Sequence, residues 1–249
     1  MSANPPNPKV GRTPPPPGWG DDDLSNFLDG TRHNQFATFH NKKSRYSELA
    51  TIDLCFHKVL TNIINPADAI SPLMFYRCHS VYRAACATSM AGQAAETFVL
   101  LRSCLEYAAY GFAMFRDPKL ATVWLERHED AQSRRASVQE FQIIKIREMI
   151  DGVDTGLTSV FQELYDRAID FGAHPNVRAA GSNMAIEERD GMTYIIQQYT
   201  NKEGDALELG LRSTAQVGVC CLMLFQHAYQ AKFLLLGVRD TLLELRQRL

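Results

Sequence analysis

Apolar residues recur at helical spacing along most of the chain from Leu24 onward, and prolines and glycines interrupt this pattern where helices should begin or end. The fold class that this pattern predicts is all-α, a bundle of about six helices. The six main helices are expected at about 44–65, 71–89, 93–115, 118–150, 157–171 and 205–237, followed by a short amphipathic end.

One segment, at about 184–200, departs from the helical pattern. Asp190 and Gly191 lie between two short runs, 185–187 and 193–196, the second of which is rich in residues that favour strands. An Asp-Gly pair in this position is a strong signal for a tight β-hairpin. We therefore expect one small β-hairpin inserted between the last two main helices.

The beginning of the chain has a different composition. Prolines at positions 5, 6, 8 and 14–17 cannot continue a helix or donate to a sheet ladder, and such runs favour extended polyproline geometry. We expect residues 1–23 to form a disordered, proline-rich tail and residues 24–249 to form a single helical domain. The alternative for the tail is a peptide that docks on a proline-binding domain.

The overall composition is that of a soluble globular protein. Of the 249 residues, 45% are hydrophobic and 22% are charged, and 26 Lys and Arg oppose 28 Asp and Glu for a net charge of −2. These values exclude a wholly disordered chain, a collagen-like fibre and a membrane bundle. A balance so close to neutrality also argues against a domain devoted to non-specific nucleic-acid binding, which needs a basic surface.

Apolar runs and cysteines bear on location. The N-terminal segment lacks the apolar run of a secretory signal, and the most apolar later stretch, 215–238, is interrupted by Gln226, His227, Gln230 and Lys232. The 6 cysteines form neither a C-x-x-C zinc pattern nor a disulfide ladder, so we interpret them as small core residues in a reducing compartment. The sequence therefore predicts a cytoplasmic protein that does not span a membrane.

Motifs for common cofactors are absent from the sequence. It contains no phosphate-binding loop, dinucleotide fingerprint, zinc-protease helix or hydrolase nucleophile elbow. Asp53 and His57 are four residues apart but lack a third ligand, so they do not indicate a metal site. Tyr76, His79 and Arg83 share one face of the second expected helix, where a cavity lining and ordinary core positions explain them equally. We expect no cofactor and no bound metal.

The expected helix at 93–115 carries the most promising polar pair. Arg102 and Glu106 are two of only three charged residues between Ala94 and Phe115, and their spacing places them on the same side of a helix. A desolvated arginine can hold a carboxylate or a phosphate with two parallel hydrogen bonds, and a nearby carboxylate can orient it. The alternative is a buried ion pair that only fixes helix packing.

Two other segments supply candidate partners for this pair. His174 precedes a proline at the exit of an expected helix, where its direction should be fixed, and Asn176 follows it closely. Arg127 and His128 lie in the expected helix at 118–150, where a solvated charged face is the alternative. The predicted ligand-binding residues are Arg102, Glu106, His174, Asn176, Arg127 and His128, and the predicted ligand is a small anion or RNA.

Four short motifs carry a family resemblance. They are Gly92-Gln-Ala-Ala-Glu96, Leu100-Leu-Arg-Ser-Cys-Leu-Glu106, Trp124-Leu-Glu-Arg-His128 and Phe171-Gly-Ala-His-Pro-Asn176. Over most of residues 73–249 the chain resembles a group of uncharacterised bacterial helical proteins associated with the HEPN-like superfamily, in which an Arg-x-x-x-Glu helix and a later loop histidine recur. The resemblance implies an all-helical bundle, often a homodimer, sometimes found in prokaryotic defence or toxin systems that act on RNA.

The chain departs from that family in one respect. Active HEPN ribonucleases carry arginine and, five positions later, histidine on one helix, and none of the 7 histidines here has an arginine five positions earlier. Our first hypothesis is therefore a ligand- or partner-binding protein with a buried polar pocket of Arg102, Glu106 and His174. The alternative is a metal-independent enzyme that processes RNA or nucleotides, in which Arg102 stabilises a phosphorane and His174 moves a proton.

Overall fold

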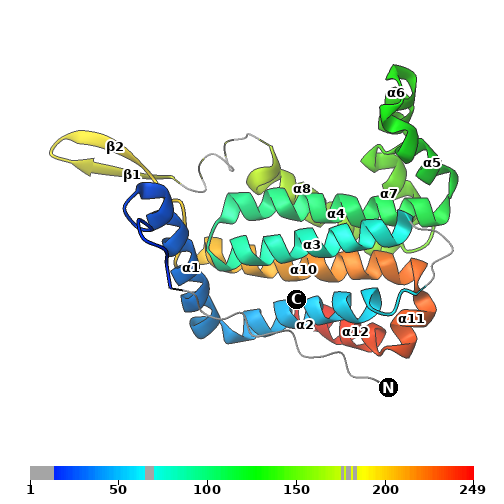
Figure 1. Cartoon of the computed structure of the whole chain (residues 1–249), viewed down its shortest axis with the longest axis horizontal. Helices are drawn as coiled ribbons and strands as arrows, with labels where there is room; N and C mark the ends of the chain where they lie inside the picture. The colour runs from blue at the N-terminus through cyan, green and yellow to red at the C-terminus, as the bar shows by residue number, and fades with distance from the viewer. Residues whose placement is uncertain (1–13, 65–69, 175–176, 178–180, 182–183) are drawn as a thin grey trace.

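The computed structural model describes residues 14–64, 70–174, 177, 181 and 184–249 (Figure 1). Within these residues it contains eleven α-helices and one two-stranded antiparallel sheet. The predicted all-α class and the inserted hairpin are confirmed. The predicted number of about six helices is an undercount.

The elements follow the chain in a simple order. The helices are α1 (Asp23–Asn41), α2 (Lys43–Leu60), α3 (Ile70–Met90), α4 (Ala94–Arg116), α5 (Lys119–Leu125), α6 (Ala131–Glu140), α7 (Ile143–Asp151), α8 (Thr155–Ala168), α10 (Asp205–Ala228), α11 (Gln230–Leu235) and α12 (Val238–Arg248). The strands are β1 (Met184–Arg189) and β2 (Met192–Gln197), and two short turns of helix are η1 (Glu126–His128) and the π-helical η2 (Ile169–Ala173).

The predicted helix at 118–150 is wrong as one element, because the chain there forms α5, η1, α6 and α7. Asp130 adopts an extended backbone, and its carboxylate accepts a hydrogen bond from the Ser133 amide at 2.7 Å. A carboxylate in this position satisfies an amide that would otherwise lack a partner, and it therefore starts a new helix. Gln142, also extended, makes the second break before α7.

The predicted helix at 205–237 is also divided. Tyr229 leaves the helical region, with φ −123° and ψ 36°, and ends α10. Gly237 adopts the left-handed conformation, with φ 67°, between α11 and α12. Glycine adopts this conformation without steric cost, so it separates two helices that the apolar pattern alone had joined.

The hairpin follows its local turn chemistry. β1 pairs with β2 in antiparallel register, with Arg189 opposite Met192 and Ile186 opposite Ile195. Asp190 and Gly191 between them have φ values of 54° and 72°. Two consecutive positive φ values are what the tight hairpin turn of an Asp-Gly pair requires. The prediction from this dipeptide is confirmed.

The N-terminal segment is described from residue 14 onward, so residues 1–13 of the predicted tail lie outside the described residues. The Asp22 carboxylate accepts a hydrogen bond from the Ser25 amide at 2.9 Å and thereby caps α1. On α1, the Asn34 amide group donates to Ala91 O at 2.7 Å, in the turn between α3 and α4. The Asn201 amide donates to Gly92 O in the same turn at 2.8 Å. The start of α4 is therefore held from two sides.

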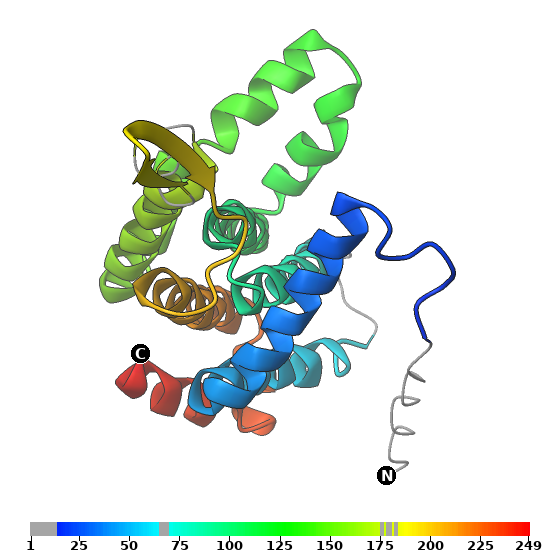
Figure 2. The same cartoon turned by 90° about the vertical axis from the view of Figure 1, so that its left-hand side faces the viewer.

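α4 is the central helix of the bundle. It packs against α3, α8 and α10, which surround it when the bundle is viewed nearly end-on (Figure 2). α2 and α12 lie on the far side of α3 and α10, the hairpin projects from one end, and α5 and α6 project from the other (Figure 1). The centre of the fold is therefore a packing of α4 with α3 and α10, supported by α8.

α4 and α10 are long and apolar enough, by length and composition, to cross a membrane. In the bundle, 56% and 72% of their most apolar windows are buried inside the protein. Their place in the core accounts for this composition, because a helix with neighbours on most sides is apolar on most sides. The expectation that the chain does not span a membrane stays a prediction.

Two glycines of the central helices make room for neighbouring side chains in the core. A Cβ at Gly111 on α4 would lie 2.8 Å from Phe225 Cε1 on α10. A Cβ at Gly218 on α10 would lie 2.6 Å from Tyr82 Cε2 on α3 and 2.7 Å from Ile52 Cγ2 on α2. These distances are shorter than carbon atoms tolerate, so the side chain has to be absent at both positions.

We expect Gly218→Ala to lower the free energy of unfolding by about 1 to 3 kcal/mol, because the added methyl group overfills a packed core. Gly210→Ala on the same helix is the matched control, since a Cβ there meets no atom within 4 Å. It should be neutral or raise stability by up to about 1 kcal/mol. Urea denaturation followed by circular dichroism measures both; equal effects of the two substitutions would contradict this packing.

Candidate functional site

Arg102 and Glu106 meet on the side of α4 that faces α8. Arg102 Nε donates to Glu106 Oε1 at 2.9 Å, and the hydroxyl of Tyr165 on α8 donates to the same oxygen at 2.9 Å. The Arg102 guanidinium also lies 5.4 Å from the centre of the Tyr165 ring. We call Arg102, Glu106 and Tyr165 the Arg102 cluster. The sequence predicted the pair, whereas Tyr165 was not foreseen.

The Arg102 cluster is partly exposed. The side chains of Arg102 and Glu106 have exposed fractions of 27% and 33%, so the burial expected from the apolar helix is wrong. The reason is that α8 covers only one flank of this side of α4. Burial raises the pKa of Tyr165 to about 12, and the negative charge of Glu106 contributes in the same direction. Tyr165 therefore stays protonated and donates to Glu106 over the whole neutral range.

The cluster retains hydrogen-bonding capacity. The hydrogen bond from Arg102 uses Nε, and Glu106 accepts both of its hydrogen bonds at Oε1. Among the described residues, the direct hydrogen bonds of the cluster use Arg102 Nε and Glu106 Oε1 and leave Glu106 Oε2 without one. Burial lowers the pKa of Arg102, but the Tyr165 hydroxyl and Glu106 outweigh it, so Tyr165 also acts on the guanidinium. A guanidinium in this state still offers paired donors to an anion.

Arg127 lies in η1. Burial and the charge of Glu106 raise the pKa of Tyr110, and the charges of Arg127 and Arg102 oppose that rise. Arg127 and the Arg102–Glu106 pair therefore act on the same tyrosine of α4, and no hydrogen bond or ion pair among the described residues joins Arg127 to the pair. His128 follows it in the same short turn and is exposed.

His174 lies in a different place. It directly follows η2 and is exposed, and two residues earlier the chain packs against α4, where a Cβ at Gly172 would lie 2.1 Å from Ala95 O. Ala95 precedes Arg102 by seven residues, which is about 10 Å along a helix. Among the described contacts of Arg102 and Glu106, none is to His174. Asn176 lies outside the described residues.

A second ionic group joins α2 to α3. The Asp53 carboxylate contacts His79 Nε2 at 2.7 Å and accepts two hydrogen bonds from Arg83, from Nε at 2.6 Å and from Nη2 at 2.9 Å. The Phe56 ring stacks on the His79 ring with the centroids 5.0 Å apart. We call Asp53, His79 and Arg83 the Asp53 network. Because both oxygens of the Asp53 carboxylate accept hydrogen bonds, we interpret the Asp53 network as a structural link between α2 and α3.

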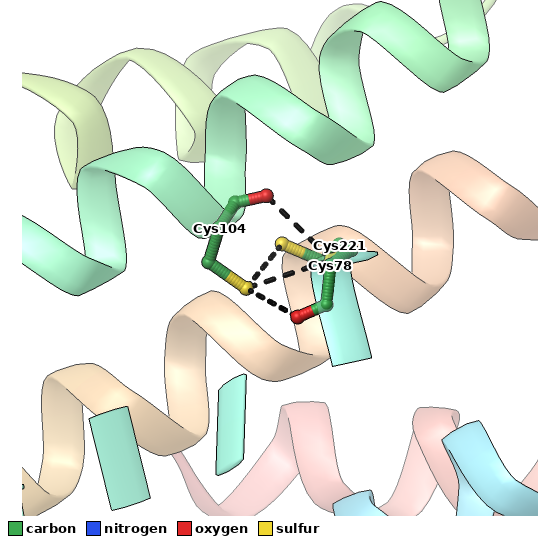
Figure 3. Close-up of side chains that lie close together, drawn as sticks. All are labelled: Cys78, Cys104 and Cys221. Atoms are coloured by element: carbon green, nitrogen blue, oxygen red, sulfur yellow. Dashed lines mark hydrogen bonds between the residues drawn. The ribbon is translucent and has the colours of Figure 1, made fainter. Parts of the chain in front are cut away.

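Three cysteine thiols meet between α3, α4 and α10 (Figure 3). Cys104 Sγ lies 3.5 Å from Cys78 Sγ and 3.7 Å from Cys221 Sγ, and all three sulfur atoms lie within 4.8 Å of one another. Hydrogen bonds from the Cys221 and Cys78 thiols lower the pKa of Cys104. Burial raises the pKa of the Cys78 and Cys221 thiols well above its usual range. We call these three residues the thiol cluster.

The sequence predicted buried cysteines but not the thiol cluster. Along the chain, Cys104 is 26 residues from Cys78 and 117 residues from Cys221, so no local spacing connects them. The only sequence signal was that each cysteine lies in an apolar stretch of a different helix. How those helices pack decides whether the thiols meet, and the apolar pattern does not contain that information.

The Asp53 network should make the free energy of unfolding depend on pH. Burial raises the pKa of Asp53, but hydrogen bonds from His79 and Arg83 outweigh burial and hold the pKa well below its usual range. A carboxyl with a lowered pKa stabilises the fold above its unfolded pKa of about 4 and loses this contribution as the pH falls from about 5 through its folded pKa. We therefore expect Asp53→Asn to lower the free energy of unfolding at neutral pH. Below about pH 5 the stability of this variant should fall less steeply than that of the wild type.

Urea denaturation at several pH values tests this expectation. Glu140→Gln is the control, because Glu140 pairs with Lys145 where both side chains are about half exposed, at 45% and 44%. Exposed pairs contribute about 0 to 1 kcal/mol, so this variant should follow the wild type. Parallel curves for the wild type and Asp53→Asn would contradict the role of Asp53.

Comparison of the chain with family models, with curated protein sequences and with solved structures gave no match. The resemblance to the HEPN-like superfamily therefore stays a prediction of the sequence. Any function has to be argued from the geometry of the Arg102 cluster, the Asp53 network and the thiol cluster.

Proposed function

We propose that this protein is a helical binding protein that holds a small anionic ligand at the Arg102 cluster. The observation that carries the proposal is the fixed, partly exposed guanidinium of Arg102, which is held at Nε by Glu106 and against the Tyr165 ring. A planar guanidinium binds a carboxylate or a phosphate through two parallel hydrogen bonds. The cluster supplies this donor already oriented.

The surroundings suit a single small anion. The exposed fraction of 27% leaves Arg102 open to solvent, so a ligand can reach it. Arg127 adds a second positive charge that acts on Tyr110, as the charge of Arg102 does. A long RNA would need many basic contacts, and a chain with a net charge of −2 offers few. One carboxylate or phosphate group is therefore the ligand that fits best.

The alternative enzyme needs Arg102 and His174 to act on one substrate. No hydrogen bond or ion pair among the described residues joins them, so we do not build a reaction on this pair. The homodimer, the cytoplasmic location and the link to prokaryotic defence or toxin systems stay predictions of the sequence and of the resemblance.

Arg102→Met should remove anion binding. We expect inorganic phosphate, adenosine monophosphate or benzoate to raise the midpoint of thermal unfolding of the wild type, because a ligand bound at a hundred times its Kd adds about 2.7 kcal/mol of stability. Arg102→Met should not respond to the same probe. Arg83→Met should respond as the wild type does, because Arg83 is committed to Asp53 through two hydrogen bonds. Differential scanning fluorimetry measures all three.

Tyr165→Phe tests whether the orientation of the Arg102 guanidinium, and not only its charge, contributes to binding. This variant keeps the ring beneath the guanidinium but loses the hydrogen bond to Glu106 Oε1, so it should bind the probe more weakly than the wild type and more strongly than Arg102→Met. A wild type that responds to no probe, together with a marked loss of stability in Arg102→Met, would instead make the cluster a structural ion pair.

A further inference from the structure

The thiol cluster is the most concentrated group of reactive side chains in the described part of the chain. Its three members come from three core helices, and Cys78, Cys104 and Cys221 are each 0% exposed. Figure 3 shows Cys104 joined by hydrogen bonds to both Cys221 and Cys78, and all three sulfur atoms lie within 4.8 Å of one another. The remaining cysteines, Cys55, Cys86 and Cys220, are not part of this group.

The environment of the cluster is apolar and nearly uncharged. The three cysteines belong to the hydrophobic core, and apart from one another's thiols their polar contacts are the backbone carbonyls of Cys104 and Cys78. Cys78 Sγ lies 3.5 Å from Cys104 O, and Cys104 Sγ lies 3.5 Å from Cys78 O. Outside the cluster, His79 is a basic side chain whose charge acts on Cys104, but its Nε2 atom is bound to Asp53. Among the described residues, no lysine or arginine forms a hydrogen bond with the three thiols.

We propose that Cys78, Cys104 and Cys221 form a binding site for a trivalent thiophilic species, for which arsenite, As(OH)3, is the probe. Each of the three thiols replaces one hydroxide on arsenic. Three S–H bonds and three As–O bonds break, three S–As bonds form, and three water molecules leave. No electron is transferred, and the product carries no net charge.

Charge balance favours this species over other soft ions. Three thiolates around Cu(I) would carry two negative charges, and three around Zn²⁺ would carry one. A net charge in an apolar core without a counter-ion is costly. Zinc in proteins also takes a fourth ligand, and no fourth His, Cys, Asp or Glu joins the cluster among the described residues. A neutral product with three ligands avoids both problems.

The spacing of the sulfur atoms points the same way. Bonds of about 2.3 Å, the length of a zinc–thiolate bond, place sulfur atoms about 4.0 Å apart in a planar arrangement and about 3.5 Å apart in a pyramid. The distances of 3.5 Å and 3.7 Å from Cys104 are nearer to the pyramid, and the third pair, Cys78 and Cys221, lies within 4.8 Å, which a small side-chain movement can close. Trivalent arsenic with a lone pair is pyramidal, whereas three-coordinate Cu(I) is planar.

Native mass spectrometry of the reduced full chain after long incubation with one equivalent of arsenite tests the site. Long incubation is needed because a buried site is reached only through local opening of the bundle. We expect one adduct, heavier by one arsenic atom less three protons, and a higher midpoint of thermal unfolding. Cys220→Ala, which changes the neighbouring buried cysteine on α10, should form the same adduct.

Cys104→Ala should abolish this adduct, and Cys221→Ala serves the same purpose if Cys104→Ala does not fold. An adduct that persists in both variants, or one that has lost only two protons, would overturn the three-thiol site. Arsenite that lowers the unfolding midpoint would also overturn it, since binding would then favour the unfolded chain. In a competition arm, one equivalent of Cu(I) or Zn²⁺ that displaces arsenite would overturn the assignment to a trivalent species.

Discussion

The close crossing of α3, α4 and α10 is the constraint on which the rest of the structure depends. Large and small residues alternate here, because Gly111 and Gly218 make room for the rings of Phe225 and Tyr82, and three cysteines lie between the helices. Such complementary packing brings many atoms into van der Waals contact. The other helices, α2, α8 and α12, then pack around a centre whose dimensions are already set.

α4 serves two kinds of chemistry on opposite sides. Arg102 and Cys104 are two residues apart, and two residues turn a helix by about 200°. Cys104 therefore faces α3 and α10, where water is excluded, while Arg102 faces α8 and solvent. The same short segment holds a soft sulfur ligand in an apolar environment and a hard cation at the surface. These two settings select different partners, so a ligand at one does not compete with a ligand at the other.

Local features of the fold were predictable from the sequence. The hairpin followed from Asp190-Gly191, and the pairing of Arg102 with Glu106 followed from their spacing within one helix. The breaks at Asp130 and Tyr229 were not predicted. The charged stretch around Asp130 fits the solvent face of one long helix, and apolar spacing continues across Tyr229. At Asp130 a side chain that competes for a backbone amide decides the outcome, and no apolar pattern records that competition.

Features that join distant segments were beyond the sequence. Tyr165 reaches Glu106 across 59 residues, and the thiol cluster draws on three helices. His174 was expected beside Arg102, but the packing of Gly172 against Ala95 sets its place at the beginning of α4. The residue types in the sequence indicated anion binding at Arg102, whereas helix packing determines which side chains lie beside one another.

The contact of Gly111 with Phe225 has a consequence for how this chain can change over generations. A Cβ at Gly111 would lie 2.8 Å from Phe225 Cε1 and 3.0 Å from Met74 Cβ, so a larger residue is accommodated only if a neighbour shrinks. In relatives of this protein, substitutions at 111 and 225 should therefore be correlated. Residues on α6, where Ser137 alone is buried, are under no such restriction and can drift independently.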